Sequence, residues 1–221
     1  MGKLKFNKAS IKYVIGEIII VSIGILIAFG INTYSSGLSK DKKHKEYKNS
    51  LIVDINENIK NIDRIQKVQK LKVVELNSIV QMIGQTTMDY DSISTLLYRQ
   101  RKSPTFFPVS GTFKSLVSIG EFGNFSTELK RRLFNLYDAN YERTVYNGQL
   151  YDNIYVDVYD KEIRDIMDFS SMKIENKERL KSKEFAKNIR QIIDEAQSYI
   201  SLIGKSKSES KQLLELIDSS K

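Results

Sequence analysis

The chain has 221 residues, which is enough for one or two domains, and it carries a formal net charge of +8. It has no cysteine and a single histidine, His44, so a disulfide scaffold, a thiolate site, a His-based triad and a multi-histidine metal site are excluded. No glycine-rich phosphate loop, nucleophile elbow or basic stripe alternating with aromatic residues is present. The sequence therefore predicts no catalytic, cofactor or metal site, no nucleic-acid partner and no small-molecule substrate.

The first predicted element is a transmembrane helix over residues 13–34. A spanning helix needs about 20 mostly apolar residues, and between Tyr13 and Thr33 the only charged side chain is that of Glu17. In lipid every backbone amide must be paired within the segment, which a helix achieves. Two alternatives stay open: a buried core helix of a soluble domain, and a signal peptide cleaved near Ala28-Phe29-Gly30.

Glu17 is the one costly residue of this span, because an acidic side chain at the bilayer centre costs about 2.5–3.5 kcal/mol. It lies near enough to the end of the span for its carboxylate to reach the head groups beside Lys12. It also shares a helical face with Gly24 and Ala28, whose four-residue spacing lets two helices approach closely. These three residues are the candidates for helix packing inside the membrane, and ion coupling through Glu17 is the alternative.

The flanks of the span predict its orientation. Residues 1–12 form a basic tail with four lysines and no acid, whereas residues 40–48 carry five lysines on the far side. The first lysine beyond the span lies several residues away from it, and long domains cross membranes largely regardless of charge. We therefore expect a single-pass protein of the inner membrane, with a cytoplasmic tail over 1–12 and the bulk of the chain in the periplasm.

Residues 35–221 are predicted to form an extramembrane helical domain, with long helices over about 41–83, 126–169 and 178–217. The first of these carries a heptad seam with two glutamines in its middle, and a second apolar stripe makes its face wider than that of a simple coiled coil. The glutamines either set register and oligomeric state or lie at the edge of the seam. The predicted seam comprises Ile52, Ile55, Ile59, Ile62, Gln66, Gln69, Val73, Leu76, Val80 and Ile83, and the second stripe comprises Leu51, Ile65, Val68 and Val74.

Between the long helices the sequence predicts a loop flanked by short helices. Gly84 and a polar run end the first helix, and short helices are expected over 93–101 and 112–118. The stretch between these two holds both prolines of the chain, around Phe106 and Phe107. We expect the two rings to pin the loop onto the bundle, and the alternative is an exposed aromatic site for a partner. Phe106 and Phe107 are therefore the partner-loop candidates.

The two remaining long helices differ in composition. Ser126 is the predicted N-cap of the helix over 126–169, in which tyrosines recur at helical spacing and Gly148 is a candidate kink. Such a stripe buries the rings and leaves the hydroxyls in water, and binding of a sugar or peptide is the alternative. In the last helix, Gly204 and the run KSKSES are expected to interrupt the apolar pattern. The predicted fold is all-α, with one N-terminal transmembrane helix followed by an elongated antiparallel helical bundle that has coiled-coil-like seams.

Two stretches resemble an uncharacterised bacterial family of single-pass membrane proteins. The first is YVIGE at 13–17 with IGILIA at 23–28 and IN at 31–32, and the second, looser one begins at GTF, 111–113. Members of that family begin with a basic tail and an IGE…IGILIA span, which a charged helix follows. The resemblance implies the topology and the helical fold, and it implies no activity because the function of the family is unknown.

We expect an anchored helical interaction or scaffold protein of the bacterial envelope without catalytic activity. Its expected partners are the lipid bilayer and either a second copy of the chain or another membrane protein. The alternatives are an accessory single-span subunit of an ion-conducting or ion-driven complex that uses Glu17, and a sensor whose bundle binds a small ligand. A Glu17→Gln substitution separates the first two, because only the ion-coupled role requires a carboxylate.

Overall fold

The computed structural model describes residues 8–100 and 103–219, including their side chains except those of 8–20, 34–36 and 124. The chain divides into two compact units, Met1–Asn49 and Ser50–Lys221, and each is described by itself. Helix α1 begins in the first unit and ends in the second. The predicted all-α fold is confirmed, since the strands of the described residues are two segments of two residues each.

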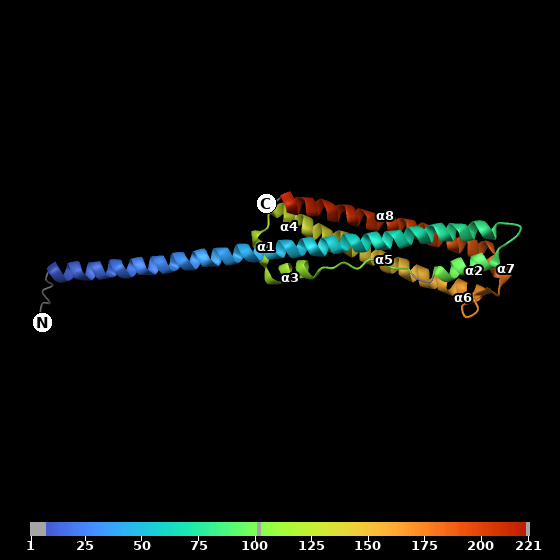
Figure 1. Cartoon of the computed structure of the whole chain (residues 1–221), viewed down its shortest axis with the longest axis horizontal. Helices are drawn as coiled ribbons and strands as arrows, with labels where there is room; N and C mark the ends of the chain where they lie inside the picture. The colour runs from blue at the N-terminus through green and yellow to red at the C-terminus, as the bar shows by residue number, and fades with distance from the viewer. Residues whose placement is uncertain (1–7, 101–102, 220–221) are drawn as a thin grey trace. The chain divides into compact units, whose positions relative to one another are not determined.

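The described part of the chain consists of helices joined by short connections (Figure 1). Turn η1 is a 3₁₀ turn, η2 and η3 are π-helical, and the two strands pair as a hairpin in which Met167 lies opposite Ile174. In chain order the elements are α1 (Lys8–Ile83), α2 (Tyr90–Arg99), α3 (Gly111–Ile119), η1 (Glu121–Asn124), α4 (Thr127–Phe134), η2 (Asn135–Tyr141), α5 (Glu142–Ile154), η3 (Tyr155–Asp160), α6 (Lys161–Ile166), β1 (Met167–Asp168), β2 (Lys173–Ile174), α7 (Lys177–Leu180) and α8 (Lys183–Ser219).

Helix ends follow local chemistry. The Ser126 side chain accepts a hydrogen bond from Leu129 N, which satisfies one of the amides left free at the start of α4. Helix α1 ends immediately before Gly84, and α3 ends before Gly120, whose φ of 68° is a conformation that other residues rarely adopt. The predicted break at Gly84 and the predicted N-cap at Ser126 are confirmed.

The second unit is an antiparallel bundle of four segments: α1 from residue 50, the stretch from α2 to α3, the wall from α4 to α6, and α8 (Figure 1). Neighbouring segments are antiparallel: as residue numbers rise along one segment, those of its contacts in the other segment fall. Asn58 of α1 lies against Val109, whereas Gln69, further along α1, lies against Pro104. The same order relates the α4–α6 wall to α8 through the pairs Tyr141–Ser210 and Thr144–Ser206.

Residues 103–110 form an extended strap between α2 and α3 (Figure 1). An extended segment without a neighbouring strand leaves its peptide groups unpaired, and buried peptide groups need partners. Pro104 and Pro108 have no N–H, so neither adds a donor that would need one. Side chains of α1 and α8 pair with four of the other groups: Asn58 with Val109 N and O (2.7 and 2.9 Å), Gln69 with Pro104 O (2.9 Å) and Tyr199 with Phe106 N (2.8 Å).

The buried face of α1 carries four polar residues, Asn58, Gln69, Lys72 and Glu75. Asn58 and Gln69 hold the strap, and Lys72 lies against a tyrosine ring of the α4–α6 wall. The predicted seam consisted almost entirely of apolar residues, but most of its residues are half-buried rather than fully buried. Apart from Glu75, the buried positions lie three and four residues apart: Leu51, Ile55, Asn58, Ile62, Ile65, Gln69, Lys72, Leu76 and Ile79.

The two glutamines of the predicted seam form bonds within the chain. Gln69 is buried under the strap, and Gln66 donates to Ile200 O of α8 (3.1 Å). Each therefore joins α1 to another segment of the same bundle, which is a third role beside the two that the sequence suggests.

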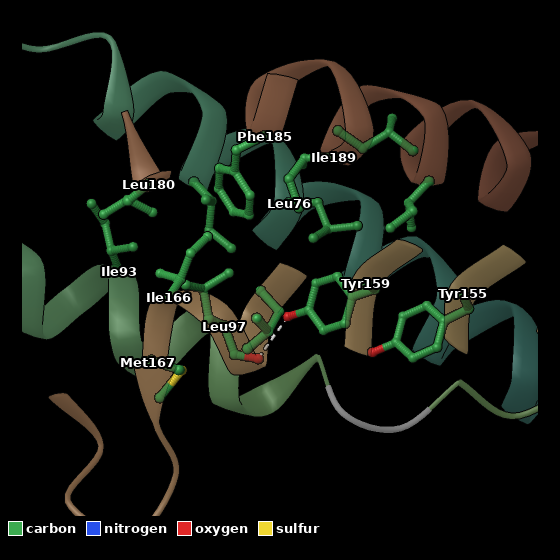
Figure 2. Close-up of a cluster of buried hydrophobic side chains, with 14 residues drawn as sticks. Leu76, Ile93, Leu97, Tyr155, Tyr159, Ile166, Met167, Leu180, Phe185 and Ile189 are labelled. Atoms are coloured by element: carbon green, nitrogen blue, oxygen red, sulfur yellow. Dashed lines mark hydrogen bonds between the residues drawn. The ribbon is translucent and has the colours of Figure 1, made fainter. Parts of the chain in front are cut away.

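A large apolar core lies where α2, α6 and the start of α8 meet α1 (Figure 2). Leu76, Leu97, Ile166 and Phe185 converge there from four different elements, and all are fully buried. Tyr159 is buried beside them and donates its hydroxyl to Leu97 O (2.7 Å), so the polar end of this ring is satisfied inside the core.

Helix α8 is unbroken from Lys183 to Ser219, so the predicted interruption at Gly204 and KSKSES is wrong. The buried Ser206 and Ser210 hydroxyls bond to the hydroxyls of Thr144 and Tyr141, each at 2.7 Å. Serine is tolerated in a core when its hydroxyl is paired. The polar run therefore faces the bundle with Ser206 and Ser210.

Gly148 allows close packing within the bundle. A Cβ at this position would lie 3.1 Å from Tyr199 Oη and 3.2 Å from Thr105 Cβ, which is closer than nearly all real contacts of a Cβ. Helix α5 continues through Gly148 from Glu142 to Ile154. The glycine thus lets the strap and α8 approach α5 closely, which the sequence alone does not reveal.

Replacing Asn58 with alanine is expected to destabilise the bundle by about 2–4 kcal/mol, because both polar backbone atoms of Val109 lose their partner. Chemical denaturation of the full chain in detergent micelles measures the change. The matched control is Asn56→Ala, whose side chain is exposed and bonds only within α1, and we expect about 0.5 kcal/mol or less there. Equal effects of the two substitutions would contradict the role assigned to Asn58.

Candidate functional site

The strap presents Phe106 and Phe107 to opposite sides, as extended backbone does with successive residues. Phe106 is fully buried, and its ring lies 5.2 Å from that of Tyr141 between centroids. Phe107 is 59% exposed. The two interpretations of this loop therefore divide between its residues: Phe106 pins the strap to the bundle, and Phe107 stands at the surface.

Beside Phe107 lies a groove of about 420 Å³, named here the aromatic groove. Its walls come from the strap, from α3 and from the wall formed by η2 and α5. Phe113 and Tyr137 stack there, with ring centroids 4.5 Å apart and an angle of 6° between the ring planes. The apolar and aromatic residues that line the aromatic groove are Phe107, Pro108, Phe113, Tyr137, Val145 and Tyr146.

The rings of the aromatic groove are held by further aromatic contacts. Phe113 meets Phe122 and Phe134 edge-on, with centroids 5.9 and 5.3 Å apart, and Tyr137 meets Tyr141 edge-on at 5.2 Å. Such pairs contribute about 0.5–1.5 kcal/mol each beyond the area that they bury. The wall is therefore fixed before any partner arrives.

Charged side chains stand on two sides of the aromatic groove. Asp138 and Glu142 belong to the η2–α5 wall, Lys114 belongs to α3, and all three are exposed. Within the described residues neither acid forms an ion pair. Like charges four residues apart on a helix repel each other by about 0.2–0.5 kcal/mol. The acidic side of the aromatic groove is thus left without a counter-charge.

The tyrosines beneath this wall stay neutral. Burial raises the pKa of Tyr137 well above its usual range, and the nearby Tyr141 and Asp54 raise it further. Burial raises the pKa of Tyr141 to about 12, although the bond to Ser210 opposes the shift. The wall therefore offers the aromatic groove uncharged phenol rings, and neither tyrosine serves as an acid or base near neutral pH.

Two π-helical turns carry tyrosines of the third segment. Turn η2 holds Tyr137 and Tyr141, and turn η3 holds Tyr155 and Tyr159. π-Helical turns are rare and are frequent at functional sites. The sequence predicts a single α-helix here, because the four-residue spacing of the tyrosines fits an α-helix equally well. No pattern in the sequence signals the extra residue in each turn.

A second unusual site lies where α1 packs against η3. The Lys72 ammonium lies 3.6 Å from the centroid of the Tyr155 ring and 5.7 Å from that of Tyr151. The residue is only 3% exposed, and its Nζ has no hydrogen-bonding partner among the described residues. Cation–π attraction to Tyr155 offsets part of the cost of burying the charge.

Burial lowers the pKa of Lys72 to about 7, against an opposing effect of the Asp152 carboxylate. Asp152 in turn accepts a hydrogen bond from Thr105 of the strap (2.9 Å). Lys72 is therefore a titratable group in the interior, next to the contacts that hold the strap. The sequence analysis missed it because a lysine on a charged helix suggests a solvated face.

The residues predicted to pack inside the membrane lie in the first unit. Gly24 and Ala28 are exposed, and no atom of the chain lies within 4 Å of a Cβ built at Gly24. The Glu17 side chain lies outside the described residues. Gly24 and Ala28 are thus exposed within the first unit.

A comparison with protein families identifies the chain. The model of a family of unknown function, DUF6090, matches residues 17–197. The chain belongs to this family. No curated protein and no solved structure matches it. The DUF6090 match includes the apolar stretch, the strap, the aromatic groove and Lys72.

Among the described residues, no group of three or more histidine, aspartate or glutamate side chains is placed to hold a metal ion. Several buried polar side chains of this DUF6090 chain bond to the backbone of another segment, as Asn58, Gln69 and Tyr159 do.

Substituting Lys72 with methionine is expected to stabilise this DUF6090 chain at neutral pH and to change how its stability depends on pH. In the folded chain the pKa is lowered to about 7 from 10.5, so the unfolded chain binds more protons between these values. The free energy of unfolding therefore rises with pH, by about 2 kcal/mol from pH 7 to pH 9, and levels off below pH 7.

Denaturant titrations of the full chain in micelles at pH 7 and pH 9 measure this difference. Lys72→Met should remove it, whereas Lys70→Met, which replaces an exposed lysine of the same helix, should leave it unchanged. The same pH dependence in all three proteins would show that Lys72 keeps an ordinary pKa.

Proposed function

We propose that the protein is a membrane-anchored helical interaction protein of the bacterial envelope, without catalytic activity of its own. One observation carries the proposal: the large apolar side chains from Val21 to Ile31 are 50–69% exposed. The α1 stretch that contains them has a mean hydropathy of 1.4 and is long and apolar enough to cross a membrane, and within the described residues none of it is buried.

An all-round apolar helix needs a cover, and the described residues of the first unit do not supply one. The second unit completes its own core from residues 51–217. A core helix of a soluble domain would be covered by its own fold, which favours lipid as the cover here. Thr33 donates its hydroxyl to Phe29 O (2.9 Å), so this polar group is satisfied within the helix, as a membrane requires.

The signal-peptide alternative and the orientation in the membrane are judged from the same stretch and from the residues before it. Helix α1 passes through Ala28-Phe29-Gly30 without a break, which favours an uncleaved anchor over a signal peptide. The lysine-rich, acid-free residues 1–12 favour a cytoplasmic N-terminus in the inner membrane, with the bundle in the periplasm. In this proposal the anchor holds the bundle at the membrane, and the surface of the bundle contacts the partner.

The aromatic groove supports the interaction role. Phe107 and Tyr146 remain 59% and 61% exposed although the core beneath them is complete. Exposed aromatic residues around a concave, pre-formed wall are typical of protein–protein contact sites. Partners of this kind include another membrane protein and a second copy of the chain.

Placing two arginines in the anchor, Leu26→Arg with Ile27→Arg, tests the anchoring. Each arginine near the bilayer centre costs about 2.5–3.5 kcal/mol, so most of the variant should leave the membrane fraction. The matched control is Leu71→Arg with Val74→Arg, which replaces two similarly exposed apolar residues of α1 in the bundle. Fractionation and alkaline extraction measure the distribution. Loss of both variants from the membrane, or of neither, would contradict an anchor at 21–33.

A Glu17→Gln substitution separates the proposal from an ion-driven accessory subunit. An anchored interaction protein should keep its partners in crosslinking from native membranes, because the amide preserves the shape of the side chain. Assembly that survives while the activity of the assembled complex is lost would instead assign the working role to the Glu17 carboxylate.

A further inference from the structure

The aromatic groove has an acidic side that nothing in the described chain neutralises. Asp138 and Glu142 are exposed, four residues apart, and both line it. Their mutual repulsion destabilises the helix that carries them. A cation placed across the two carboxylates would relieve that repulsion, so this side of the aromatic groove is complementary to lysine or arginine.

The apolar side of the aromatic groove is complementary to a bulky side chain. Phe107 of the strap and Tyr146 of α5 are both exposed, and Val145 of α5 lines the groove beside them. The volume of about 420 Å³ lies at the low end of the range for ligand sites. It is suited to one or two large apolar side chains that project from a segment lying across the surface.

An anionic occupant fits this surface poorly. The first turn of α3, where an anion would be favoured, already donates Thr112 N to the Asp54 carboxylate (3.1 Å). Lys114 is the one cation among the lining residues, against the two acids. The excess lysines of the chain lie in other blocks, at 3–12, 40–48 and 181–187.

We propose that the aromatic groove docks a peptide segment of another envelope protein, in which a bulky apolar residue is followed within one helical turn by lysine or arginine. The apolar side chain lies between Phe107 and Tyr146, and the cation lies across Asp138 and Glu142. This inference rests on the proposed function, since it names the chemistry of the partner of an anchored interaction protein.

The test is a selection of random twelve-residue displayed peptides on the full chain in nanodiscs. The expected consensus combines a large apolar residue with a nearby lysine or arginine. Reversing the acids, Asp138→Lys with Glu142→Lys, should weaken those peptides by at least about tenfold and should shift the selection to acidic peptides. A control, Glu215→Lys with Asp218→Lys, makes the same charge change on exposed residues of α8 and should bind as the unaltered chain does.

Three results would overturn the inference. They are an acidic or charge-independent consensus, no enrichment, and enriched peptides that bind equally to a Phe107→Ser, Tyr146→Ser chain. Benzoylphenylalanine in place of Tyr146 supplies a second measurement in cells, and crosslinks to another copy of this chain or to lipid alone would also overturn it. Loss of the membrane anchor in fractionation overturns the proposed function instead, so the two failures are distinguishable.

Discussion

A buried peptide group without a hydrogen-bonding partner costs about 1–3 kcal/mol, and the extended strap at 103–110 has no helix or sheet of its own to provide partners. The buried face of α1 is built around this constraint. Asn58 and Gln69 occupy positions that would otherwise hold apolar residues, and each bonds to the backbone of the strap. The strap in turn directs Phe107 outward and lies against Gly148, so the aromatic groove depends on side chains of another segment.

Features that depend on neighbouring residues could be predicted from the sequence. The end of α1 at Gly84 and the N-cap at Ser126 need only a few adjacent residues, and the all-α class follows from long helical patterns. The predicted seam of α1 differs from the buried face in the structure, because the buried Asn58 and Lys72 have their partners, Val109 and Tyr155, far along the chain. A polar residue in a core is recognisable only when its distant partner is known.

The candidate site shows the same division. The position of two aromatic residues between two prolines indicated the loop. Both rings were expected to pack on the bundle, but only Phe106 does so, against Tyr141, and Phe107 is exposed. In the sequence alone, Asp138 and Glu142 look like part of an ordinary solvated helix face. The structure shows that aromatic residues of α3 and the strap line the same groove. The burial of Lys72 did have a signal in the sequence. The buried positions from Ile55 to Ile79 alternate by three and four residues, and Lys72 falls on this pattern. A pattern drawn from hydrophobic residues alone leaves Lys72 out.

The π-helical turns have a consequence for how chains of this family differ in length. Each such turn holds about one residue more than an α-helical turn for the same rotation about the helix axis. The helical parts on both sides of η2 therefore keep their faces, and Leu133 before it and Thr144 after it are both buried. A chain that lacked one residue within 135–141 would close this turn into an α-helix with both flanks still in register. A single-residue insertion or deletion there therefore changes the helix only locally, beside the stacked Tyr137 and Phe113, and leaves the bundle in place.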